Sequence, residues 1–261
     1  MRIVIKVGTS TLTYATGRVN VRRFSALCRT VSDIMNSGTE VILVTSGAIG
    51  LGTGKLHLQG KPKDIAGKQA AAAVGQCELM YMYDKEFSEY NQTVAQILLT
   101  APDLKCDDRR IKFHNTLEKL IEFGALPIIN ENDTVATEEI VFGDNDTLAA
   151  EVAVSVEADL LILLSDIDGL YTGNPKTDRN ATLIPEVREI TEEVMALGGG
   201  AGSSLGTGGM QTKLKAAKIA TDAMCDMVIA NGKSPEILYG IVNGESIGTR
   251  FFSNKVKNEN D

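Results

Sequence analysis

The sequence has no tryptophan, few aromatic residues and no long run of basic residues. Aromatic side chains make up 5% of the 261 residues, and the formal net charge is −8. No cluster of Lys and Arg is longer than the pair Arg109-Arg110. A nucleic-acid partner calls for a basic face, and a single strand also calls for aromatic side chains on which bases stack. The composition therefore argues against nucleic-acid binding, although a few lysines could still bind a small anion inside a cleft.

Histidine is almost absent, and the four cysteines are scattered. The two histidines, His57 and His114, lie far apart in the sequence, and no C-x-x-C pair occurs. A zinc site is therefore not expected, and we expect the cysteines to be buried or half-buried thiols in a reducing compartment.

Long apolar segments are missing as well. No apolar run approaches the roughly 18 residues that cross a membrane. The apolar start of the chain, residues 1–7, is too short for a signal peptide and contains Lys6. These absences predict a soluble cytoplasmic protein without a membrane partner.

Short β-branched runs alternate with amphipathic helical segments along the chain. Residues 2–7 are typical of a strand, and Asn20 is expected to cap a helix that Gly38 ends. This alternation predicts an α/β protein with a largely parallel sheet covered on both faces. No linker or repeat divides the chain, so we expect one domain at 1–253 and a polar tail at 254–261. Further helices are expected at 65–89, 108–123, 146–156 and 210–224, further strands at 41–45, 93–99, 126–129, 160–164 and 227–230, and a final element at 249–252.

Polar and glycine-bearing segments follow the strands of this expected sheet. They are residues 8–10, 46–50, 130–133 and 165–169. Ligands of parallel α/β sheets bind at the carboxyl ends of the strands. The repeated placement of polar residues after strands therefore predicts the rim of an active site.

A glycine-rich segment at 198–213 contains seven glycines in sixteen residues and leads into a helix-forming stretch. Glycines let backbone N–H groups converge on phosphate oxygens, and a helix N-terminus favours an anion. Lys213 lies where it could reach a phosphate, although a flexible lid without a ligand is an alternative. No G-x-G-x-x-G motif occurs, and we interpret residues 232–234, GKS, as a surface turn because a P-loop would need a glycine at Met227.

Two further features have both a structural and a functional interpretation. Lys6 lies in an apolar strand, where it either points into a cleft or reaches solvent at the strand end. Asp144, Asn145 and Asp146 precede an expected helix. Asp146 could cap that helix or hold ammonium groups, a substrate or Mg²⁺, and capping accounts for only one of the three residues.

Seven segments of the chain carry a family resemblance when they are taken together. They are KVGTS at 6–10, VTSGAI at 44–49, KQAAAAVGQ at 68–76, NEND at 130–133, GDND at 143–146, DGLYT at 168–172 and GTGGMQTK at 206–213. Together they resemble the amino acid kinase family, and within it the branch that phosphorylates the side-chain carboxylate of L-glutamate. The resemblance extends over nearly the whole chain. The segments GTGGMQTK and INENDTVAT separate this branch from the aspartokinases, carbamate kinases and uridylate kinases.

The resemblance implies a three-layer α/β/α sandwich that converts ATP and L-glutamate into L-glutamyl 5-phosphate and ADP at the start of proline biosynthesis. It also implies Mg²⁺ on the nucleotide, a homodimer or homotetramer, and possible feedback inhibition by L-proline through residues 131–146. Many members carry an additional C-terminal domain of the RNA-modification type, and we expect none here.

The resemblance also assigns site residues. Lys6 and Lys213 would neutralise the migrating phosphoryl group, and Asp146 would hold the two lysines. Glutamate would be bound by Ser46, Asp133 and Asn145. The nucleotide would be bound by Lys6, Ser165, Asp166, Thr207, Gly208, Gly209, Met210, Gln211, Thr212 and Lys213.

Two alternatives remain. Another family member could use a different small acid or a phosphate as acceptor, but a phosphate would call for basic residues in 46–52, and none occurs before Lys55. A non-catalytic sensor of nucleotide or amino acid should have lost one of Lys6, Asp146 or Lys213, and all three are present.

Overall fold

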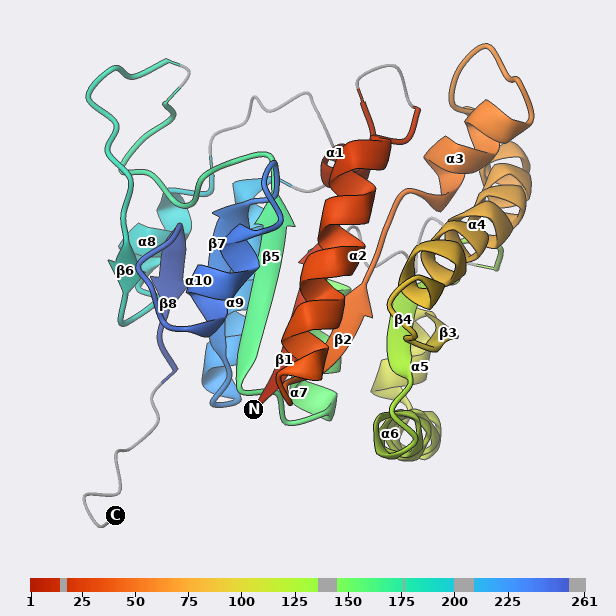
Figure 1. The fold of residues 1–261 in the computed structure, drawn as a ribbon. Helices are drawn as coiled ribbons and strands as arrows, with labels where there is room; N and C mark the ends of the chain where they lie inside the picture. The colour runs from red at the N-terminus through yellow and green to blue at the C-terminus, as the bar shows by residue number, and fades with distance from the viewer. Residues whose placement is uncertain (15–17, 136–144, 176, 200–208, 254–261) are drawn as a thin grey trace.

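The computed structural model describes residues 1–14, 18–135, 145–175, 177–199 and 209–253. The strands of these residues form one eight-stranded sheet in the order β3-β4-β2-β1-β5-β7-β8-β6 (Figure 1). All neighbours from β3 to β7 are parallel, β8 is antiparallel to β7, and β6 is parallel to β8. The strands are β1 Arg2–Val7, β2 Glu40–Val44, β3 Val94–Leu99, β4 Leu126–Glu131, β5 Leu160–Ser165, β6 Glu186–Val187, β7 Asp226–Asn231 and β8 Thr249–Phe251.

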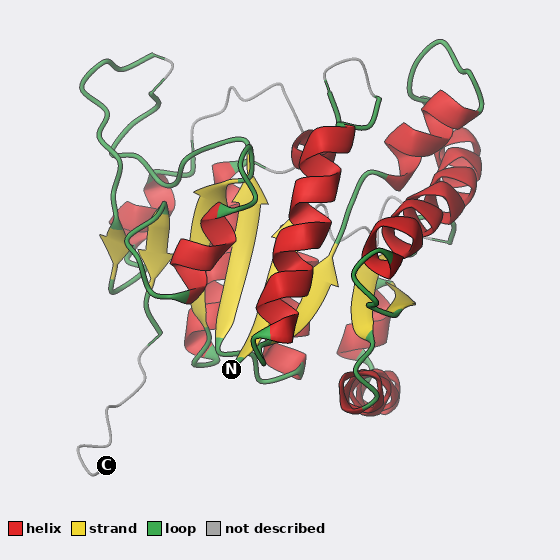
Figure 2. Cartoon of the chain, in the orientation of Figure 1, coloured by secondary structure: helices red, strands yellow, loops and turns green. Residues whose placement is uncertain are grey.

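Helices cover both faces of the sheet (Figure 2). One apolar core lies between the sheet and α2, α4 and α10, and the other lies between the sheet and α6, α7 and α9. The expected three-layer α/β/α sandwich is therefore confirmed. The helices are α1 Thr9–Leu12, α2 Val21–Asn36, α3 Ala48–Lys55, α4 Ile65–Ser88, α5 Ala101–Lys105, α6 Asp107–Glu122, α7 Asn145–Ser155, α8 Glu192–Ala196, α9 Met210–Asp222 and α10 Ile237–Val242.

The central strand β1 supplies both cores because successive side chains of a strand point to opposite faces. Ile3, Ile5 and Val7 pack with α2 and α4, and Val4 packs on the opposite face. Lys6 follows Val4 on that second face, toward α7 and α9. The strand thus places a lysine at its carboxyl end between two helices.

The long periodic elements agree with the sequence to within a few residues. Asn20 caps α2 by accepting a hydrogen bond from the Arg23 backbone N–H at 3.1 Å, and Gly38 follows the helix with φ +96°. The short elements α1, α3, α5, α8, α10 and β6 were not predicted, because few residues give no clear periodicity. Likewise, nothing in the pattern of β8 indicated its antiparallel pairing.

Several smaller expectations can also be compared with the structure. Cys28 and Cys225 are buried and Cys106 is half-buried, but the expectation was wrong for Cys77, which is exposed on α4. Residues 232–234 form a turn, as expected. Among the described residues no helix is long and apolar enough to cross a membrane.

Candidate active site

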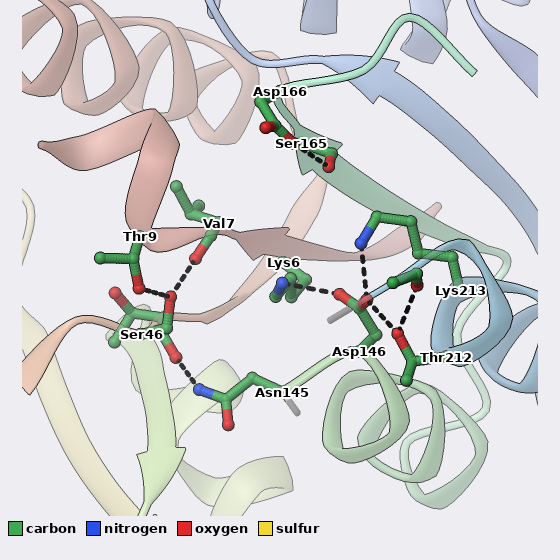
Figure 3. A network of polar contacts seen from close by, with 12 residues as sticks. Lys6, Val7, Thr9, Ser46, Asn145, Asp146, Ser165, Asp166, Thr212 and Lys213 are labelled. Atoms are coloured by element: carbon green, nitrogen blue, oxygen red, sulfur yellow. Dashed lines mark hydrogen bonds and ion pairs between the residues drawn. The ribbon is translucent and has the colours of Figure 1, made fainter. Parts of the chain in front are cut away.

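The polar segments after β4, β2, β1 and β5 meet at one edge of the sheet. These four strands are neighbours and run parallel, so their carboxyl ends lie side by side. Figure 3 shows side chains from three of these strand ends, and from α7 and α9, gathered around one centre. The expected clustering of these polar segments is confirmed, because parallel strands end on the same side, and their role as the rim of an active site stays a prediction.

Two lysines from different elements bind one aspartate at the centre of this rim. Lys6 Nζ lies 2.6 Å from Asp146 Oδ1, and Lys213 Nζ lies 2.9 Å from Asp146 Oδ2 (Figure 3). Asp146 is 0% exposed, Lys213 5% and Lys6 9%. The Thr212 hydroxyl also donates to Asp146 Oδ2 at 3.3 Å. The centre therefore joins β1, α7 and α9 through one carboxylate.

The environment of Asp146 determines its charge. Burial by itself would raise the pKa of this carboxyl, but the charges of Lys6 and Lys213 and their hydrogen bonds outweigh burial, and the pKa lies below its usual value. Asp146 is thus an anion between two cations, with one positive charge in excess. It lies in the first turn of α7 and its carboxylate binds both lysines, while the Lys6 side chain is largely buried and ends on Asp146. The positions of both residues are compatible with the functional interpretation, and their roles stay a prediction.

Ser46 and Asn145, which are predicted to bind glutamate, lie beside this centre. Ser46 Oγ donates to the Val7 carbonyl at 3.0 Å and contacts Thr9 Oγ1 at 3.1 Å. Asn145 Nδ2 donates to the Thr45 carbonyl, which precedes Ser46 (Figure 3). Two segments about a hundred residues apart in the sequence are thereby held together.

Asp133, the third residue predicted to bind glutamate, lies in the turn after β4 and is half-buried. Burial raises the pKa of its carboxyl above the usual value. A partly desolvated carboxylate binds a cation more favourably than one in bulk water. The residue is therefore suited to an ammonium group.

The predicted nucleotide residues lie toward β5 and α9. Ser165 is buried and donates to the exposed Asp166 at 3.3 Å, while Gly209 is the N-cap of α9 with no side-chain cap. Met210, Gln211, Thr212 and Lys213 form the first turn of α9. Thr207 and Gly208, together with Gly143 and Asp144 of the GDND segment, lie outside the described residues.

One polar cluster at this rim was not singled out from the sequence. Asp168 accepts hydrogen bonds from Asn231 at 2.7 Å and from the Tyr171 hydroxyl at 3.1 Å, and so joins the ends of β5 and β7. The segment DGLYT contained the signal, because it was part of the resemblance. Its pairing with Asn231 depends on the adjacency of β5 and β7 and could not be inferred from spacing.

The donor set shows what kind of metal site the rim can provide. The described residues contain no group of three or more His, Cys, Asp or Glu side chains placed to hold a metal ion. Both oxygens of the central Asp146 are bound by lysines. Mg²⁺ is commonly held by substrate phosphates with only one or two carboxylates. A nucleotide-borne Mg²⁺ therefore fits these residues better than a protein-bound ion.

Comparison with known proteins identifies the family of the chain. The model of the amino acid kinase family matches residues 1–231. The chain belongs to the amino acid kinase family. The carbamate kinase from Giardia lamblia bound to AMP-PNP has the same fold, with a TM-score of 0.68 at 17% identity, over 97% of this chain and 98% of that chain.

Within the family, the chain is similar to glutamate 5-kinases. The glutamate 5-kinase of Clostridium perfringens is 54% identical over 258 residues, which is 97% of this chain and 96% of the relative. That of Clostridium acetobutylicum is 55% identical over 250 residues, 96% of this chain and 94% of the relative. The likeness thus extends over almost the full length of both relatives.

Proposed function

We infer that this chain transfers the γ-phosphoryl group of ATP to the side-chain carboxylate of L-glutamate, giving L-glutamyl 5-phosphate and ADP in the first step of proline biosynthesis. The observation that carries the inference is the buried Lys6–Asp146–Lys213 centre in a chain more than 50% identical to glutamate 5-kinases. A degraded relative would have no reason to keep two lysines buried at one carboxylate, since burying charges is costly.

The chemistry of the step explains why the centre consists of lysines. Phosphoryl transfer needs little covalent help, and it depends on in-line positioning and on fixed positive charge where negative charge accumulates. We propose that Lys6 and Lys213 stabilise the phosphoryl group from two sides while Asp146 keeps their ammonium groups apart and oriented. The N-terminus of α9, where Gly209 is the N-cap and provides no side-chain cap, would offer backbone N–H groups to the nucleotide phosphates.

The acceptor explains why the site needs no general base. A glutamate side chain has a pKa near 4.3, so it is already an anion at neutral pH and can attack without losing a proton. Asp146, with a lowered pKa and both oxygens engaged, is suited to orienting lysines rather than removing a proton. Ser46, Asp133 and Asn145 are proposed to bind the rest of the glutamate molecule, with Asp133 facing its ammonium group.

Further proposals concern the bound nucleotide and the assembly. Ser165 and Asp166 are proposed to contact the nucleotide, and Mg²⁺ to accompany its phosphates and neutralise part of their charge. L-proline is proposed to compete at the glutamate site, because it presents the same ammonium and α-carboxylate groups. A cytoplasmic homodimer or homotetramer is the expected form, and light scattering would measure its mass.

A coupled assay of ADP release tests the proposal. The chain is supplied with ATP and Mg²⁺ and, in separate reactions, L-glutamate, L-aspartate, N-acetyl-L-glutamate or UMP. We expect turnover with L-glutamate at least a hundredfold above the others, because binding groups left unpaired by a wrong substrate are costly. Turnover only with another acceptor would contradict the assignment of glutamate. Adding L-proline to the same reaction tests inhibition, which should be relieved by more L-glutamate.

A further inference from the structure

Four side-chain amides form a continuous chain from the outer strand of the sheet to the proposed glutamate site. Gln76 Nε2 on α4 donates to Gln96 Oε1 on β3 at 3.0 Å. Asn130 Nδ2 on β4 donates to Gln76 Oε1 at 2.9 Å, and Asn145 Nδ2 on α7 donates to Asn130 Oδ1 at 2.8 Å. Asn130 is 2% exposed and Gln76 8%. We call these four residues the amide relay.

Two backbone groups fix the direction of the amide relay. The Glu131 N–H donates to Asn130 Oδ1 at 2.9 Å, and the Thr45 carbonyl accepts from Asn145 Nδ2. A backbone N–H can only donate and a carbonyl can only accept, so the oxygen and nitrogen of both asparagines are determined. Both protons of Asn145 Nδ2 are then used. Within the described part of the chain, Asn145 Oδ1 is left as the atom that can bind a substrate.

An acceptor at this position distinguishes among the groups of L-glutamate. At neutral pH the amino acid carries two carboxylates, which only accept hydrogen bonds, and one ammonium group, which only donates them. Asn145 Oδ1 is complementary to the ammonium group and repels both carboxylates. With Asp133, it would give the ammonium group two acceptors.

We propose that Gln76 is a positioning residue that determines specificity for a free α-ammonium group, because it holds Asn130 and through it the amide of Asn145. This inference rests on the proposed function. Asn130 is buried, so its Nδ2 needs an acceptor, and Gln76 Oε1 supplies it. Without that acceptor, Asn130 would have to rotate and give up its bonds to Glu131 or Asn145. At the other end Gln96 is exposed, so water can replace it.

The test uses the full chain and compares Gln76→Met with Gln76→Glu. Methionine fills nearly the same volume but offers no strong acceptor, so the KM for L-glutamate should rise about tenfold while the KM for ATP stays within about twofold. Gln76→Glu keeps an oxygen for Asn130, and exposed Gln96 can turn its own amide toward it. This variant should return the KM to within about threefold of the parent.

Inhibition by glutarate distinguishes a positioning role of Gln76 from a general structural role. Glutarate has both carboxylates of glutamate and no ammonium group, so its inhibition constant should not change in Gln76→Met. The matched control is Gln96→Leu, which removes an amide at the exposed end and should leave the KM for L-glutamate within about twofold. Thermal denaturation of each variant reports its stability.

Two results would overturn the inference. One is an unchanged KM for L-glutamate in Gln76→Met. The other is a rise in the inhibition constant of glutarate by the same factor as the rise in the KM for L-glutamate. If Gln76→Met fails to fold, the KM of Asn145→Asp for L-glutamate is the deciding measurement. The new oxygen of this variant would face the Thr45 carbonyl and Asn130 Oδ1, so the KM should rise, whereas a simple added charge near the ammonium group would lower it. If the parent chain shows no turnover of L-glutamate, the proposed function is refuted, and this inference is refuted with it.

Discussion

At the scale of single residues, the site is governed by how a few buried charges are balanced. Asp146 is completely buried and is an anion because Lys6 and Lys213 each contribute an ion pair. A buried ion pair adds little net stability, since desolvation offsets most of the attraction. The arrangement is therefore better explained by chemistry than by folding, and removal of one lysine should affect rate more than stability.

Lys213→Ala is expected to lower kcat by about a hundredfold to a thousandfold, because one fixed positive charge is lost where the phosphoryl group moves. The melting temperature should change by only a few degrees, since Asp146 keeps Lys6 and the Thr212 hydroxyl. Steady-state kinetics and thermal denaturation measure the two effects. Lys215→Ala, an exposed lysine on the same helix, is the control and should behave like the parent chain. A Lys213→Ala enzyme with the parental kcat would remove Lys213 from the mechanism.

Asp133→Asn is expected to raise the KM for L-glutamate about tenfold or more, because the proposed contact with the substrate ammonium group loses its charged partner. The same variant should be more stable near neutral pH. Burial raises the pKa of Asp133, so its ionised form is disfavoured in the folded chain above that pKa. The penalty disappears below the unfolded pKa of about 3.9, where the carboxyl is neutral in both states.

Melting temperatures of the parent and Asp133→Asn, measured between pH 4 and pH 8, test this sign. The difference between the two melting temperatures should be largest near neutral pH and should disappear toward pH 4. Asp84→Asn changes an exposed acid and serves as the control. A parent chain that is more stable than Asp133→Asn at pH 7 would show that Asp133 has a stabilising partner in the absence of substrate.

At the scale of elements, the position of the proposed glutamate site depends on how closely two helices cross. A Cβ on Gly75 of α4 would lie 1.7 Å from the Ala48 carbonyl oxygen of α3, and a Cβ on Gly52 would lie 1.7 Å from the Ala71 carbonyl oxygen. No side chain fits at either place. Because α3 begins directly after Ser46 and Gly47, this crossing sets where Ser46 lies.

Gly75→Ala should therefore separate α3 from α4. We expect a loss of about 1–3 kcal/mol in the free energy of unfolding, as is usual for overpacking, and a higher KM for L-glutamate with little change in the KM for ATP. Chemical denaturation and kinetics measure these quantities. Gly54→Ala on α3 is the matched control, because nothing lies within 4 Å of its added Cβ, and it should stabilise the helix by up to about 1 kcal/mol. Equal effects of the two substitutions would contradict the close crossing.

At the scale of the whole molecule, two acids join segments that are distant in sequence. Asp146 joins α7 to β1 and α9, and Asp226 on β7 binds Arg250 at 3.0 Å and Ser253 at 2.7 Å near the end of β8. Burial would raise the pKa of each, but in both cases the basic partner and hydrogen bonds outweigh it and lower the pKa. Both acids therefore favour the folded state more when they are ionised than when they are protonated.

Acid should destabilise the chain in a defined window. A lowered folded pKa contributes stability that is present above the unfolded value of about 3.9 and is lost as the pH falls through the folded value. The melting temperature should be nearly constant from pH 6 to pH 8 and fall steeply below about pH 4. Asp226→Asn should have a lower melting temperature than the parent chain at neutral pH, and its melting temperature should decrease less as the pH falls. A parent melting temperature that is unchanged at pH 3 would contradict this account.

The sequence alone determined the long elements and the chemical type of the site. Apolar residues at regular spacing identified β1, α2 and α4, because periodicity over many residues reflects which face is buried. Lys6 in an apolar strand and Lys213 after a glycine-rich segment indicated an anion site, and the resemblance identified the acceptor as glutamate.

Only the tertiary structure decided how these residues meet. The distances from Asp146 to the two lysines, the amide relay from Gln96 to Asn145 and the contact of Gly75 with Ala48 all join residues that are distant in the sequence. Spacing along the chain reports local conformation, whereas these contacts depend on strand order and helix packing. The sequence therefore determined which chemistry is present, and the fold determined where each charge and each hydrogen-bond acceptor lies.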